Sequence, residues 1–176
     1  MAFFKRIGVA RVLLVIAALL AVAIGQYKPL NTAQKELEEL FFSGDAYGIS
    51  AASQLEAKRA AAANLATVAE RYRGVDETPV SKSQWNLAQA LSKRSISQVL
   101  EENATLTREV PALYAALREI DLAEEDARLV SEQYADYLAA ADRFKRCGFY
   151  AAATAFNAEF DGGVYALFDV ELYPLS

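Results

Sequence analysis

The stretch that decides the fold is residues 96–120, ISQVLEENATLTREVPALYAALREI. Apolar side chains recur in it at alternating steps of three and four residues, a spacing typical of an α-helix that packs one face against other helices. The positions that follow this spacing are Ile96, Val99, Asn103, Leu106, Val110, Leu113, Leu117 and Ile120. Pro111 lies inside the run and is expected to kink or split the helix, because proline lacks a backbone donor.

The flanking segments also show helical spacing. Residues 26–42, residues 49–72, a stretch that begins near Ser81, and residues 121–160 each predict a helix. The expected buried stripe of the second of these is Leu55, Ala62, Leu65, Val68 and Tyr72. The expected seam of the last is Val130, Tyr134, Tyr137, Ala141, Phe144, Gly148 and Ala151.

The first 25 residues have the pattern of a membrane anchor. An unbroken apolar run over residues 12–24 follows three basic residues, Lys5, Arg6 and Arg11. Because this run is shorter than a span of roughly 20 residues, we extend the expected lipid-contacting segment to residues 7–25. Basic residues favour the cytoplasmic side, which predicts a single-pass protein of the cell membrane with a cytoplasmic N-terminus and an extracytoplasmic bundle. A cleaved signal peptide is the alternative, since the run contains an Ala-Val-Ala triplet.

These patterns predict an all-α protein in which an N-terminal transmembrane helix continues into an antiparallel three- to four-helix bundle. Three segments are expected: residues 1–25 as anchor or signal peptide, residues 26–160 as helical bundle, and residues 161–176 as an aromatic C-terminal tail. The tail could cap the bundle or form a partner surface through its aromatic residues Tyr165, Phe168 and Tyr173.

Composition argues against several kinds of chemistry. The chain has no histidine, which removes the usual general base and a common metal ligand. Its one cysteine, Cys147, cannot form a disulfide within the chain and is expected to be a small buried residue. We therefore expect no enzyme activity, no cofactor and no metal.

Charge argues against a nucleic-acid partner. The net charge is −5, and without Lys5, Arg6 and Arg11 the remaining 15 basic and 23 acidic residues carry about −8. A nucleic-acid-binding protein normally has a clustered basic face. The acidic residues 124–126 are expected in a first helical turn, with Asp121 and Glu124 as a capping box; a metal site there is the less favoured interpretation.

Several residues resemble the LemA family of bacterial membrane-anchored proteins. Tyr27 and Leu30 match a Tyr-Asn-x-Leu motif after the anchor, with Lys28 in place of the asparagine, and Phe41 matches a later aromatic. The best-matching block has a leucine, one residue of a basic pair, an Asn-Leu pair and a tyrosine, here Leu55, Lys58, Asn64, Leu65 and Tyr72. Near the C-terminus the family carries two Tyr-Asn pairs seven residues apart; Phe156-Asn157 matches the second, and Phe149 fits the aromatic of the first, with Tyr150 in place of the asparagine. The resemblance implies an antiparallel helical bundle outside the membrane and no particular reaction.

The two matching asparagines suggest a packing role. Asn64 and Asn157 lie beside the large core residues Leu65 and Phe156, and a buried asparagine can fix helix register. We expect both to face the bundle interior and to hydrogen-bond across it. A polar ligand pocket between the helices is the functional alternative.

Two classes of function follow. The first is an interaction or scaffold protein of the cell envelope, which binds membrane lipid through residues 7–25 and a protein partner through its helical faces, with a homo-oligomer as a further possibility. The second is a ligand-binding or sensory module that works through a membrane partner. A close-packed core favours the first class, and a central polar cavity favours the second.

Overall fold

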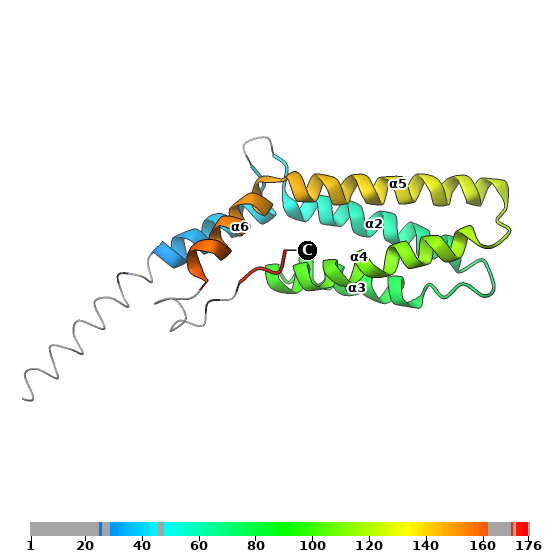
Figure 1. Ribbon diagram of the computed structural model, residues 1–176, viewed down its shortest axis with the longest axis horizontal. Coiled ribbons are helices and arrows are strands. Elements are labelled where there is room, and N and C mark those ends of the chain that lie inside the picture. Colours follow the sequence, from blue (N-terminus) through cyan, green and yellow to red (C-terminus); the bar gives the residue numbers. More distant parts are fainter. Residues whose placement is uncertain (1–24, 26–28, 46–47, 162–169, 171, 176) are drawn as a thin grey trace, which may run out of the picture.

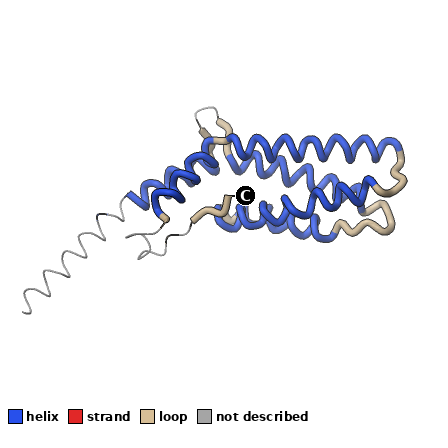
Figure 2. Tube along the Cα trace, in the orientation of Figure 1, coloured by secondary structure: helices blue, strands red, loops and turns tan. Residues whose placement is uncertain are grey.

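The computed structural model describes residues 25, 29–45, 48–161, 170 and 172–175, and every regular element within them is a helix (Figure 2). The helices α2 (Ala51–Ala69), α3 (Thr78–Ser92), α4 (Ile96–Arg118) and α5 (Glu124–Arg146) lie side by side in alternating directions (Figure 1). A helix over residues 29–42 and α6 (Gly148–Phe160) form a two-helix arm at one end of this bundle. The predicted all-α fold is confirmed.

The predicted membrane anchor falls almost entirely outside the described residues, as do Tyr27 and the tail residues Tyr165 and Phe168. Among the helices that the structure describes, none has the length and apolar character needed to cross a membrane.

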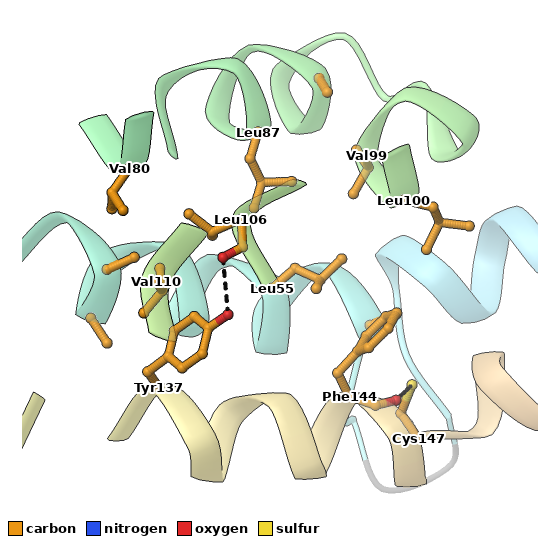
Figure 3. Close-up of a cluster of buried hydrophobic side chains, with 14 of the residues drawn as sticks. Leu55, Val80, Leu87, Val99, Leu100, Leu106, Val110, Tyr137, Phe144 and Cys147 are labelled. Atoms are coloured by element: carbon orange, nitrogen blue, oxygen red, sulfur yellow. Dashed lines mark hydrogen bonds between the residues drawn. The ribbon is translucent and has the colours of Figure 1, made fainter. Parts of the chain in front are cut away.

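The bundle core is formed by the stripe predicted from residues 96–120. The side chains from Ile96 to Leu117 on that stripe are all buried, Asn103 included, and only Ile120 is half-buried. They meet the inner faces of α2, α3 and α5, where Leu55, Leu87 and Tyr137 are also buried (Figure 3). α4 runs through Pro111 without being split, because burial on both sides of the proline outweighs its one lost backbone hydrogen bond.

The helix predicted over residues 49–72 is observed as α2. Its hydroxyl cap is Ser50, whose Oγ accepts the backbone N–H of Ser53 at 3.1 Å. The predicted stripe is buried apart from Tyr72, which lies beyond the helix end and is half-buried. The turn before α2 depends on Gly44, whose φ of +95° is poorly tolerated by residues with a side chain.

The prediction for residues 121–160 was wrong in two respects. Asp121 and Glu124 form no capping box, because α5 begins at Glu124 and its N-cap is Ala123. The hydroxyl of Tyr72, from the end of α2, accepts the Ala123 N–H at 3.1 Å instead.

The chain also breaks into two helices at Cys147, whose ψ of 155° is extended. The seam assigned to one helix therefore fails around this break: Ala141 and Gly148 are half-buried and Ala151 is exposed, whereas Ala140 and Phe149 are buried. Three basic residues in the last turn of α5 complement the negative helix terminus there: Arg143, Lys145 and Arg146.

Candidate functional site

A buried lysine lies at the centre of the bundle, where α2, α4 and α5 meet. Lys58 of α2 is only 2% exposed, and its Nζ donates to Asn103 Oδ1 at 2.7 Å and to Thr107 Oγ1 at 2.6 Å, both on α4. Its Nζ also lies 5.1 Å from the ring centroid of Tyr137 on α5, which fits a cation–π contact. The Tyr137 hydroxyl donates to the backbone carbonyl of Leu106 (Figure 3).

The electrostatics of this cluster follow from its burial. Loss of solvation and, to a smaller extent, the positive charge of Lys145 lower the pKa of Lys58 to about 8. Burial likewise raises the pKa of Tyr137 to about 12. No ion pair in the described part of the chain includes Lys58.

The polar groups of this cluster bond to one another, and the cluster reaches the surface at Thr107, which is exposed. Asn103 and Thr107 accept hydrogen bonds from two of the three ammonium donors, and the Thr107 hydroxyl donates to the backbone carbonyl of Asn103 at 2.7 Å. The amine is therefore packed as part of the core and does not face a binding cavity. A buried polar group that bonds across two helices in this way can specify which helices pair and in what register.

A second feature lies on the outer surface, on α3. Trp85 is the only tryptophan of the chain and is 60% exposed. α3 carries one charged side chain, Lys82, whereas ten of the 23 residues of α5 are charged. An exposed tryptophan on a weakly charged helix face has the composition of a protein–protein interface.

A polar groove adjoins this tryptophan. It runs between α3 and α4, encloses about 350 Å³, and is lined by Lys82, Ser83 and Asn86 from α3 and by Glu102, Thr105 and Glu109 from α4. A neighbouring hollow of about 280 Å³ shares Asn86 and Glu102 and continues along the same two helices. We call the two together the α3–α4 groove.

The floor of the α3–α4 groove contains an unsatisfied polar atom. Ser83 is 3% exposed, and its Oγ has no hydrogen-bond partner among the described residues. Helical hydroxyls elsewhere in the chain bond to their own helix: Thr67, Thr105 and Ser131 each donate to the carbonyl four residues earlier. Among the described residues, Ser83 carries the buried hydroxyl that forms no such hydrogen bond.

The asparagines singled out from the sequence do not lie where they were expected. Asn64 is exposed and donates to Gln133 Oε1 on α5 at 2.7 Å, so the prediction of an interior position was wrong for it. Asn157 is half-buried and bonds both backbone groups of Tyr173, at 2.7 and 3.0 Å. It therefore holds the C-terminal segment against α6 and does not bridge the bundle.

The other residues that match the LemA pattern are mostly core. Leu30, Phe41, Leu55, Leu65, Phe149 and Phe156 are all buried. Phe41 and Phe149 meet edge to face with ring centroids 4.7 Å apart, which joins the two helices of the arm. These positions maintain the fold, and the structure brings none of them to the α3–α4 groove.

Cys147 and the acidic residues 124–126 are accounted for by packing. The predicted burial of Cys147 is confirmed at 5% exposure; its Sγ donates to the Phe144 carbonyl at 2.9 Å, and burial raises the pKa of the thiol. Asp126 bonds Arg71 Nη1 at 2.8 Å and accepts from the Tyr72 hydroxyl at 2.7 Å. No group of three potential metal ligands converges within the described residues.

Sequence reasoning missed Trp85 and Ser83, and it named Lys58 as a match to the LemA basic pair without predicting that it is buried. Trp85 had a usable signal, because it lies five residues after the buried Val80, which places it about 140° away around a helix. Lys58 had no such signal, since its hydrogen-bond partners are 45 and 49 residues away in sequence.

Comparison of the chain with family models, with curated proteins and with solved structures finds no match. Membership of the LemA family accordingly stays a prediction that rests on the quoted residues.

Proposed function

We propose that this protein is a membrane-anchored interaction protein of the cell envelope, a divergent relative of the LemA family, that binds a protein partner through the exposed face of α3. The observation that carries the proposal is Trp85, 60% exposed on a helix with a single charge. The bundle interior supports the same class of function, since Lys58, the buried cation among the described residues, bonds Asn103 and Thr107 of α4.

The energetic argument concerns what Trp85 gains on binding. A tryptophan side chain buries roughly 150–250 Å² when covered, and apolar burial contributes about 25 cal/mol per Å². Covering the exposed part of Trp85 is therefore worth about 3 kcal/mol, before the costs of association. One residue of this kind can act as the central anchor of an interface.

The test is site-specific photo-cross-linking in cells. A benzophenone amino acid placed at Trp85 of the full chain should capture a defined protein, and the same probe at Leu138 should not. Leu138 is the matched control, because it is also a large exposed hydrophobic residue, 48% exposed, but lies among the charges of α5. The Trp85→Ala variant, tagged and cross-linked chemically, should lose that protein while the Leu138→Ala variant retains it.

Equal capture from both positions, or the same partner yield from both alanine variants, would refute binding through α3. Fractionation tests the anchor separately. The full chain should stay with membranes after a carbonate wash, and deletion of residues 1–25 should release it.

A further inference from the structure

We infer that the α3–α4 groove is a specificity pocket for a basic side chain, above all an arginine, of the protein partner. The inference rests on the proposed function and adds the chemistry that the partner must carry. Its basis is the juxtaposition, in the lining of one groove, of a carboxylate without an ion pair and a buried hydroxyl without a hydrogen-bond partner among the described residues.

The carboxylates of the groove come from α4. Glu102 lines both hollows of the groove and forms no ion pair within the part of the chain that the structure describes. Glu109, two turns further along α4, is already paired with Arg108 at 3.0 Å. Glu101 and Glu102 are therefore the groove carboxylates without an ion pair in the described part of the chain, and Glu102 is the one that lines both hollows.

The hydroxyl of Ser83 supplies a second acceptor on the opposite wall. A buried hydroxyl without a partner costs free energy, so a native protein normally satisfies it. A ligand that donates a hydrogen bond to Ser83 Oγ would remove this cost. The flat guanidinium group offers five donors in a fixed fork and can serve a carboxylate and a hydroxyl at the same time, which a compact ammonium does less well.

The surroundings favour a cation over an anion. The groove walls carry two glutamates that form no ion pair among the described residues, Glu101 and Glu102, and two exposed lysines, Lys82 and Lys93, so the charge of the whole chain decides the preference. The chain outside the predicted anchor carries about −8, which steers basic partners toward it. Trp85 is not one of the residues that line the groove, but it lies three residues after Lys82, so the two side chains are neighbours on the surface of α3 at the rim.

Trp85 also makes the inference measurable, because it is the only tryptophan and its fluorescence reports on this surface. The probe is the peptide acetyl-(Gly-Arg)₃-amide, titrated into the full chain in a non-ionic detergent. The comparison peptide has citrulline at each arginine, which keeps the shape and removes the charge. Only the arginine peptide should shift Trp85 fluorescence, and 0.5 M salt should weaken the response.

Two variants test the assigned residues. Glu102→Gln should raise the dissociation constant of the arginine peptide about tenfold, as expected for the loss of one charged hydrogen bond. The matched control Asp136→Asn, an exposed acid on α5, should leave it unchanged. Ser83→Ala should raise the dissociation constant of the arginine peptide about threefold. The variant should be no less stable than the wild type, because it loses an unsatisfied hydroxyl. If Ser83 only stabilised the fold, Ser83→Ala would lower the stability of the protein and leave its affinity for the peptide unchanged.

The outcomes separate this inference from the proposed function. No fluorescence response, an equal response to the citrulline peptide, or Glu102→Gln behaving like Asp136→Asn would overturn the arginine pocket. In those cases, photo-cross-linking of a partner at Trp85 would still support the proposed protein interface. Failure of that capture with a normal peptide response would overturn the proposed protein interface and leave a pocket for a small basic ligand.

Discussion

Replacing Lys58 with methionine removes the one charge that α2 buries against α4 and α5, while keeping a side chain of similar length. In the unfolded chain the lysine has a pKa of 10.5, and in the folded protein burial lowers the pKa to about 8. Because the folded-state pKa is the lower one, the unfolded chain binds more protons between these two values. Stability due to Lys58 therefore rises with pH across this window.

The magnitude follows from the two pKa values. Below pH 8 the buried ammonium costs the folded state about 3 kcal/mol, and this cost disappears as the pH approaches 10.5. Between pH 7 and pH 9.5 the wild type should gain about 2 kcal/mol relative to Lys58→Met. At pH 7 the two proteins should differ less, because the methionine avoids the desolvation cost but leaves Asn103 Oδ1 without its donor, a loss of about 1–3 kcal/mol.

The assay is urea denaturation of the full chain in mild detergent, followed by circular dichroism at pH 7 and pH 9.5. Measurements stay below pH 10, because the pKa of Tyr137 is raised to about 12 and its stability contribution falls as pH rises from 10 toward 12. The control Lys35→Met, an exposed lysine, should show no such difference. A wild-type advantage over Lys58→Met that stays constant or shrinks at pH 9.5 would refute the buried, desolvated amine.

Three further predictions concern the ends of the helices. Gly44→Ala should destabilise the protein by about 2 kcal/mol more than Gly74→Ala. Both glycines have a φ of +95°, but only a Cβ at position 44 would meet backbone, at 2.8 Å. Urea denaturation midpoints compare the two variants, and equal midpoint shifts would contradict the clash. Tyr72→Phe should lower stability by about 1–2 kcal/mol in thermal unfolding, because its hydroxyl joins the first amide of the α5 cap to a carboxylate; an unchanged melting temperature would argue against those bonds. Asn157→Ala should speed hydrogen exchange at the Tyr173 amide at least severalfold, and protection equal to wild type would show that other contacts hold the C-terminal segment.

Much of the fold could be predicted from local patterns, because helix periodicity is written in neighbouring residues. The buried stripe of α4 was predicted through Leu117, and the burial of Cys147 was predicted as well. The break before α6 was not, because an alternation of threes and fours can continue across two helices that meet at an extended residue. The start of α5 was also missed, since the hydroxyl that caps it comes from Tyr72, 51 residues away.

The sequence by itself determined the helical class, the absence of histidine chemistry, and an acidic body behind a basic and apolar N-terminus. Each of these depends on composition or on residues close together along the chain. Only the tertiary structure decided that Lys58 is core, that Asn64 is on the surface, and that Ser83 Oγ lies in the α3–α4 groove without a hydrogen-bond partner among the described residues. Those outcomes depend on which helices meet, because burial and hydrogen bonding are set by neighbours in space, and Lys58 finds its partners on another helix.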